Sequence, residues 1–196
     1  MSFKVLMLGW ELPPFNSGGL GVASLGLAKA LSEQGVGITF VLPQKVDLKI
    51  NFLNLVFADI KKIQGISYTT SSRFSRINFA NDFITAAYQF GERMREIAGK
   101  YDFDVIHSHD WLTFPGGVAA KEVRRKPLVT HIHSTEFDRT GGHYPNPDVY
   151  KIEREGLVRS DKVISVSQFT KNILVEKYGI NPDKIIVVHN GVSDYE

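Results

Sequence analysis

Short apolar and β-branched runs recur along the chain, and stretches with apolar residues three or four positions apart lie between them. The runs occupy residues 5–8, 38–42, 105–107, 128–132, 163–166 and 185–188. Runs of this length predict buried strands, and the intervening spacing predicts amphipathic helices. Strands that alternate with helices indicate βα units. We therefore expect a Rossmann-like α/β fold with a doubly wound, mainly parallel sheet and helices on both faces.

The helical spacing is found near residues 20–31, 79–97, 116–123, 149–158 and 167–179. The last of these helices should begin after an N-cap at Ser167 and end at a C-cap at Gly179. Residues 43–77 interrupt the rhythm, because they are rich in Lys, Ser, Thr and Asn and contain short alternating stretches. We expect an antiparallel or irregular insertion there, within a single domain spanning residues 1–196.

The composition is typical of a soluble globular domain, with 43% hydrophobic residues, 22% charged residues and a net charge of +2. A charge so close to balance argues against a nucleic-acid or membrane-surface partner. No apolar run reaches the ~18 residues that a membrane span needs. The absence of cysteine excludes disulfides and thiolate ligands. No cleavable signal pattern is seen at the start, so we expect a cytoplasmic location.

Three predicted strands end in chemically distinctive residues, at the edge where doubly wound sheets bind ligands. After the first strand, Gly18, Gly19 and Gly21 stand at the turn into a helix, and the free amides of a helix start suit a phosphate. A dinucleotide fingerprint would need glycine at position 24, which is Ser24, and an acidic residue near positions 42–44, which read Leu-Pro-Gln. NAD binding is therefore disfavoured, and no P-loop motif is present. The alternative to a phosphate site is that the glycines only form an ordinary tight turn.

The second strand end reads His107-Ser108-His109-Asp110-Trp111. Two histidines and a carboxylate at the end of a buried strand favour a functional site. The alternative is a turn in which Asp110 caps the next helix.

The third strand end begins at His131 and continues to Asp148 as HIHSTEFDRTGGHYPNPD. Strand alternation places His131 and His133 on one face of the sheet. Residues 134–148 form a long polar loop, and loops of this size at a ligand edge are usually functional. A solvated surface loop is the alternative.

These histidines also raise the question of a metal. The candidate ligands are His107, His109, Asp110, His131 and His133. Asp110 follows His109 directly, so the H-x-H-x-D-H spacing of binuclear hydrolases is absent, and no further acidic ligands are evident at the strand ends. We expect no metal, and we keep a metal-dependent hydrolase that uses the His/Asp cluster as an alternative function.

Five stretches, in this order, resemble the N-terminal domain of retaining GT-B glycosyltransferases of the group 1 and glycogen or starch synthase type. They read PPFNSGGLGVASLGLAKAL, DVIHSHDW, VTHIHSTEFDRTGG, SDKVISVSQFTKNIL and KIIVVHNGV, and they cover essentially the whole chain. The resemblance implies two Rossmann-like domains with the active site between them. The C-terminal domain, which binds most of the nucleotide sugar in that family, would be absent from this chain.

The resemblance implies a hexosyltransferase that moves glucose from ADP-glucose or UDP-glucose to a carbohydrate acceptor, an α-glucan, without a cofactor. The N-terminal domain would hold the acceptor and part of the donor diphosphate, and it would be inactive alone. A carbohydrate-binding domain that acts by itself is a further alternative. Nucleic acid and integral membrane contacts are not expected.

The resemblance also assigns residues to the site. Gly18, Gly19 and Leu20 would face the distal phosphate of the donor, and His133 and Asp110 are the catalytic candidates near the transferred sugar. The residues expected to contact sugar or acceptor are His109, Trp111, Glu11 and Arg139, of which Glu11 and Arg139 are chosen only because their loops could reach sugar hydroxyls. Asn16 stands where bacterial glycogen synthases commonly carry lysine, so the phosphate loop has one positive charge fewer.

Overall fold

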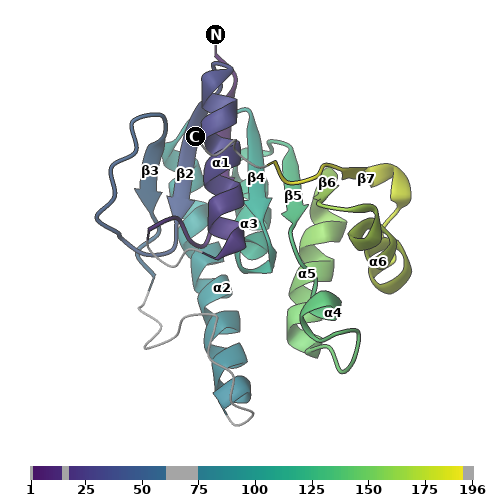
Figure 1. The fold of residues 1–196 in the computed structure, drawn as a ribbon. Coiled ribbons are helices and arrows are strands. Elements are labelled where there is room, and N and C mark those ends of the chain that lie inside the picture. Colours follow the sequence, from purple (N-terminus) through teal and green to yellow (C-terminus); the bar gives the residue numbers. More distant parts are fainter. Residues whose placement is uncertain (1, 15–17, 61–74, 192–196) are drawn as a thin grey trace.

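Seven parallel strands form one sheet in the computed structural model, which describes residues 2–14, 18–60 and 75–191 (Figure 1). The strands are β1 (Lys4–Leu8), β2 (Gly37–Leu42), β3 (Asn54–Phe57), β4 (Val105–His109), β5 (Leu128–Ile132), β6 (Lys162–Ser165) and β7 (Ile185–Val187). Their order is β3-β2-β1-β4-β5-β6-β7. The chain moves outward from β1 in one direction and then in the other, which confirms the doubly wound Rossmann-like fold.

The helices match the apolar spacing closely. They are α1 (Gly19–Glu33), α2 (Ser75–Lys100), α3 (Phe114–Arg124), α4 (Glu136–Arg139), α5 (Pro147–Arg159) and α6 (Gln168–Tyr178), with short 3-10 helices η1 (Trp111–Thr113) and η2 (Pro182–Lys184). Both predicted caps of α6 are confirmed. The Ser167 side chain accepts a hydrogen bond from the Thr170 amide, and Gly179 adopts the left-handed conformation, with φ 67°.

Helices cover both faces of the sheet, as expected. In Figure 1, α1 crosses the front of the sheet, while α2 and α3 lie behind it. Leu6 and Ile106 belong to an apolar cluster with Phe90 of α2. Met7, the next residue of β1, belongs instead to a cluster with Ala28 of α1. The strand residues therefore alternate between two separate apolar layers.

This alternation decides where the histidines of β4 point. The strand extends to His109, two residues further than expected, so His107 and His109 both lie within it. Ile106 faces α2 and α3. His107 and His109 therefore face the side of the sheet that carries α1.

The segment after β2 differs from the expectation. β3 pairs parallel with β2, with Thr39 opposite Asn54 and Leu42 opposite Phe57, so the antiparallel arrangement is wrong for this strand. Residues 45–50 contain neither helix nor strand. Apolar side chains between β2 and β3, including Leu48 and Phe52, pack on the α1 layer. This segment covers the sheet where a crossover helix would otherwise lie. Residues 61–74 of the expected insertion lie outside the residues that the structure describes.

None of the helices in the described ranges has the length and apolar character that crossing a membrane requires.

Candidate functional site

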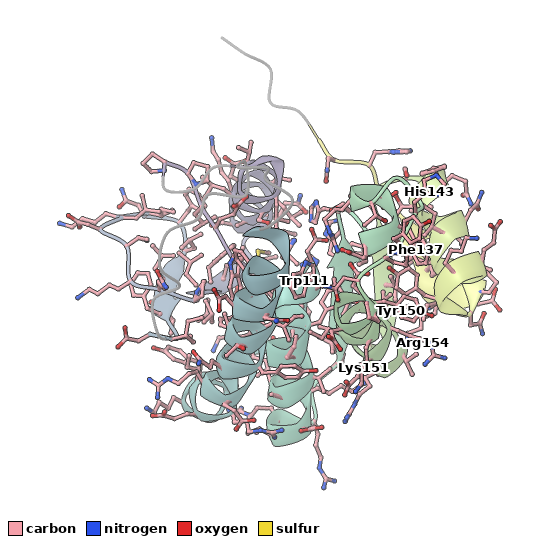
Figure 2. All side chains as sticks on the ribbon, turned by 90° about the horizontal axis from the view of Figure 1, so that it is seen from below. Trp111, Phe137, His143, Tyr150, Lys151 and Arg154 are labelled. Carbon is pink, nitrogen blue, oxygen red and sulfur yellow. The ribbon has the colours of Figure 1, made fainter. Side chains whose placement is uncertain are left out.

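The carboxyl ends of β1, β4 and β5 lie side by side, because β4 pairs with β1 on one side and with β5 on the other. The ends of these strands and the loops that follow them carry the residues singled out in the sequence. Figure 2 views the molecule from this end. The topology therefore brings three loops that are far apart in the sequence to one edge of the sheet.

Asp110 joins two of these loops. Its amide donates to the His131 carbonyl over 2.9 Å, and its Oδ1 accepts a hydrogen bond from the His133 amide over 2.7 Å. Its backbone adopts φ 56° and ψ 169°, a region that residues other than glycine rarely enter. The carboxylate makes no capping bond to η1, so the cap interpretation is wrong. Asp110 instead ties the end of β4 to the start of the loop after β5.

Burial raises the pKa of Asp110 to about 6, although the His133 amide and the Arg139 charge act against this shift. The carboxyl group is therefore within reach of protonation near neutral pH. Its hydrogen bond to the His133 amide favours the ionised form.

Four histidine rings stack along the ends of β4 and β5. The ring centroids of His131 and His133 lie 4.2 Å apart, which confirms that these two residues share a face, and those of His107 and His109 lie 4.3 Å apart. His109 Nδ1 lies 3.1 Å from His133 Nε2, a hydrogen bond whose direction depends on the tautomers. His107, His109 and His131 are buried, whereas His133 is partly exposed. His133 is therefore the member of this group that a ligand can reach.

All four imidazoles are held in the neutral form. Burial is the main cause, and it lowers the pKa of His107 to about 4, of His133 to about 4 and of His131 to about 2. The pKa of His109 is also lowered well below its usual value by burial and by its histidine neighbours. Neutral rings stack without charge repulsion, so the group can remain closely packed at neutral pH.

The glycine loop is organised by Glu11. Its Oε1 accepts hydrogen bonds from the amides of Gly18 and Gly21, over 3.1 and 3.2 Å. A Cβ at Gly18 would lie only 2.7 Å from this oxygen, so glycine leaves room for the carboxylate. The amides of Gly19 and Leu20, in the first turn of α1, have no hydrogen-bond partner in the part of the chain that the structure describes.

Glu11 and Asp110 also interact electrostatically. Burial raises the pKa of Glu11, the amides of Gly21 and Gly18 lower it, and the charge of Asp110 raises it further. The charge state of Glu11 in the glycine loop therefore depends on the charge state of Asp110 at the end of β4. Asn16 lies outside the described residues.

Two of the expected sugar contacts are enclosed. Trp111, which is labelled in Figure 2, is 6% exposed and belongs to an apolar cluster with Leu112 and Phe114. His109 is 0% exposed. In this conformation both side chains support the site from within, and neither is open to a ligand.

The loop after β5 is more ordered than a solvated surface loop. Thr135 and Asp138 form a reciprocal capping box at the start of α4. The Arg139 guanidinium donates to the Ser134 carbonyl over 2.8 Å and to Glu153 Oε1 over 2.5 Å. Glu136 Oε1 accepts from the Asn146 amide at the start of α5. Arg139, expected to reach sugar hydroxyls, therefore binds protein groups that fix this loop.

Glu153 and Tyr178 are site-supporting residues that the sequence reasoning missed. Glu153 is completely buried on α5, where its carboxylate accepts from the Glu136 amide and from the Tyr178 hydroxyl in addition to Arg139. Burial raises the pKa of Glu153, and Arg139 opposes the shift. The sequence held a signal for this residue, since Glu153 falls between Val149 and Leu157 on the apolar face of a predicted helix.

Aromatic rings surround this carboxylate. Phe137 packs edge-on against Tyr178, with ring centroids 5.6 Å apart, and against Tyr150 at 6.1 Å. Figure 2 shows Phe137 and Tyr150 together on the side of α5. The rings shield the Glu153 carboxylate from water, whereas the Arg139 side chain is partly open to solvent, so the electrostatic attraction is strengthened on the carboxylate side of the pair.

The chain is similar to known proteins in sequence and in structure. The sequence profile of Glycosyltransferase Family 4 matches residues 17–195. An uncharacterized glycosyltransferase of Methanocaldococcus jannaschii is 31% identical, with 98% of this chain and 47% of the relative covered. The glycogen synthase of Mycobacterium tuberculosis is 26% identical, with 97% and 48% covered. The chain spans about half the length of these curated relatives.

Solved structures share the fold. A sucrose-phosphate synthase from Thermosynechococcus elongatus superposes with a TM-score of 0.67 at 14% identity, over 95% of this chain and 48% of that one. An Anabaena protein solved in complex with UDP and glucose superposes with a TM-score of 0.59 at 16% identity, over 97% and 45%. The Rossmann-like sheet is thus that of GT-B glycosyltransferase structures.

The neutral histidines predict how stability depends on pH. In the fold the pKa of His131 is lowered to about 2, whereas in the unfolded chain a histidine titrates near 6.5. Below about pH 6.5 the unfolded state therefore binds a proton that the folded state does not. Each such histidine lowers the free energy of unfolding by about 1.4 kcal/mol for every unit by which the pH falls. The substitution His131→Thr removes one of these groups. Its destabilising effect should shrink by about 2 kcal/mol between about pH 7.5 and pH 5.

Urea unfolding of both proteins in buffer with EDTA measures this difference. His143→Thr is the matched control, because His143 is exposed and lies outside the histidine group, and its profile should follow the wild type. A His131→Thr effect that stays constant with pH would contradict the burial of a neutral ring.

Proposed function

The chain belongs to glycosyltransferase family 4, and on that premise we propose that it is the acceptor-side half of a retaining hexosyltransferase that uses a nucleotide sugar. The proposed reaction transfers glucose from ADP-glucose or UDP-glucose to an α-glucan. The glycogen synthase relative and the Anabaena complex with UDP and glucose support this choice of substrates. A second domain, beyond the half of the relatives that this chain spans, would bind most of the nucleotide.

The observation that carries the proposal is the pairing of two kinds of group at one edge of the sheet. The loop after β1 offers the amides of Gly19 and Leu20 at a helix start, where neither has a hydrogen-bond partner among the described residues. The loop after β5 offers His133, a partly exposed neutral imidazole. A sugar nucleotide has a diphosphate at one end and hydroxyl groups at the other, and this edge has a partner for each.

The amides of Gly19 and Leu20 suit the leaving diphosphate. When the bond between the sugar and the phosphate oxygen breaks, negative charge grows on that oxygen. The amides and the partial positive charge of the α1 start lie ready for this charge before the reaction begins. Glu11 holds the neighbouring amides of Gly18 and Gly21 in place. Cationic side chains of the second domain would complete the neutralisation.

His133 suits the sugar end for an electrostatic reason. Glycosyl transfer passes through an oxocarbenium-like state with positive charge at the anomeric carbon. A protonated histidine beside that carbon would oppose this charge, whereas the neutral His133 ring can hydrogen-bond a sugar hydroxyl without doing so. Its Nε2 is paired with His109, so Nδ1 is the ring atom available to substrate.

Asp110 has a positioning role in this arrangement. Its Oδ1 is directed at the His133 and Ser134 amides, at 2.7 and 3.5 Å, and so it fixes the backbone that carries His133. The same geometry weakens the hydrolase alternative, because the carboxylate closest to the histidines is engaged with backbone amides. A carbohydrate-binding domain that acts alone would leave the amides of Gly19 and Leu20 without a phosphate to bind.

The proposal predicts transfer by the longer protein that contains both domains. Incubation with ADP-glucose or UDP-glucose and glycogen should lengthen the glucan, and the 196-residue chain alone should show no turnover. Radiolabelled donor measures both. Absence of transfer by the longer protein with any common sugar nucleotide would contradict the proposal, and turnover by this chain alone would contradict the division of labour.

The role of His133 is tested separately by His133→Ala in the longer protein. Loss of a group that stabilises the transition state should lower kcat on the order of 10²-fold or more, with little change in the free energy of unfolding. His143→Ala, in an exposed position, is the control and should keep full activity. If unfolding shows a collapse of stability instead, His133 is a structural residue of the core.

A further inference from the structure

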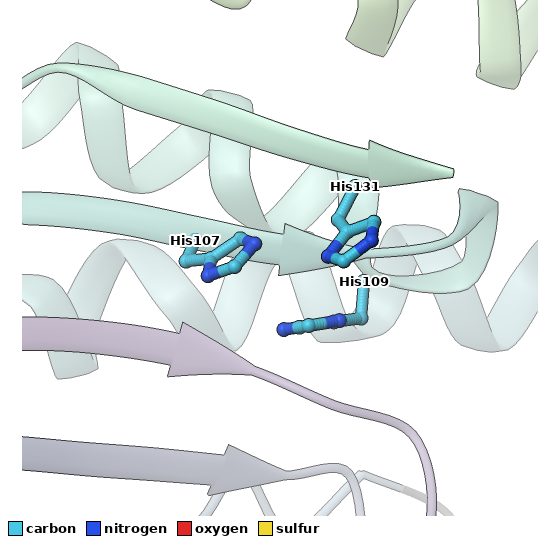
Figure 3. A group of neighbouring side chains, drawn as sticks. All are labelled: His107, His109 and His131. Atoms are coloured by element: carbon cyan, nitrogen blue, oxygen red, sulfur yellow. The ribbon is translucent and has the colours of Figure 1, made fainter. Parts of the chain in front are cut away.

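We propose that His107, His109 and His131 form a binding site for a divalent late transition-metal ion, of the zinc, nickel or copper(II) class. One ring nitrogen from each residue lies within 4.8 Å of the others. Figure 3 shows His107 and His109 on β4 and His131 on the neighbouring β5, with their rings gathered on one side of the sheet. This site departs from the absence of metal that the sequence predicts, and it goes beyond the proposed transfer reaction.

Unpaired ring nitrogens are the independent observation for this site. His107 Nε2, His109 Nε2 and both ring nitrogens of His131 are buried and have no hydrogen-bond partner in the described part of the chain. Buried polar atoms without a partner are uncommon, and a cluster of them calls for a bound ion or water. Ser108 Oγ is also buried without a partner in the described residues, and the other four such atoms are all imidazole nitrogens, which are metal-ligating atoms.

The chemistry of the ligand set selects the metal. Imidazole nitrogen suits zinc, nickel and copper, whereas magnesium and calcium prefer oxygen ligands. The rings are held neutral, which is the form that binds a metal. In a tetrahedral zinc site with Zn–N bonds of about 2.0–2.1 Å, two ligand nitrogens lie about 3.4 Å apart. The three nitrogens lie within 4.8 Å of one another, so the rings need to move closer together on binding, and a fourth position remains for water.

The ion would also define the state of His133. A metal on His109 Nε2 leaves the ring proton on Nδ1, and Nδ1 is the atom that lies 3.1 Å from His133 Nε2. His109 would then donate this hydrogen bond, and His133 would carry its own proton on Nδ1, facing away from the cluster. Groups that bond the second nitrogen of a metal-bound histidine commonly fix the ring in this way. The ion would thus orient a ring without contacting substrate.

The test uses the chain without an affinity tag, stripped of metal with a chelator and titrated with Zn²⁺ and, separately, with Co²⁺. Calorimetry should show one ion per chain, and the Co²⁺ complex should absorb in the visible region with the intensity of a four-coordinate site. The melting temperature should rise with the free concentration of the ion. His131→Asn should weaken binding at least 10-fold, and His143→Asn, at an exposed histidine outside the cluster, should leave it unchanged.

Absence of saturable binding by the wild-type chain overturns the proposal, whether or not the variants fold. Binding that survives His131→Asn, with circular dichroism showing a folded variant, also overturns it, because the ion then lies elsewhere. Should His131→Asn fail to fold, His107→Asn takes its place with the same two outcomes. A Co²⁺ spectrum typical of six water or oxygen ligands likewise contradicts an imidazole site.

Discussion

The hydrogen bonds of Asp110 link the two strands at the centre of the site. The residue occupies a backbone region that costs a side chain other than glycine about 1–3 kcal/mol, with φ 56° and ψ 169°. Two contacts to the β5 end offset this cost, namely the bond from its amide to the His131 carbonyl and the bond from the His133 amide to its carboxylate. Both contacts fix the chain that leads into His133, at the His131 carbonyl and at the amide of His133 itself. The direction of the His133 ring therefore depends on a carboxylate from another strand.

The charged groups near Asp110 are paired with one another. Arg139 lies near Asp110 and is bound to the buried Glu153. Burial disfavours the charged guanidinium, but Glu153 and Asp110 raise the pKa of Arg139 and keep it protonated. The paired charges lie on the α5 side of the loop, whereas the imidazoles beside β4 are neutral. In the proposed reaction, the site would thus offer uncharged hydrogen-bonding groups to the sugar and backbone amides to the phosphate.

Much of this could be read from the sequence because the determining patterns are local. Alternation along β5 placed His131 and His133 on one face, and the caps at Ser167 and Gly179 bounded α6. The partners of the carboxylates could not be read in this way. A capping bond and a bond to a neighbouring strand are equally compatible with the sequence around Asp110, and only the sheet register brings the His133 amide within reach. The parallel pairing of β3 likewise depends on contacts with β2 that are remote in the chain.

In this arrangement the Asp110 carboxylate positions His133. Amide hydrogen exchange at His133 in Asp110→Gly and Asp110→Asn variants of the longer protein, with glucosyl transfer measured alongside, tests this role. Glycine tolerates the positive φ but removes the acceptor, whereas asparagine keeps an acceptor oxygen. We expect Asp110→Gly to fold, to lose the protection of the His133 amide and to lose most of its turnover, while Asp110→Asn keeps that protection. Full protection and full turnover in Asp110→Gly would show that the carboxylate does not position His133.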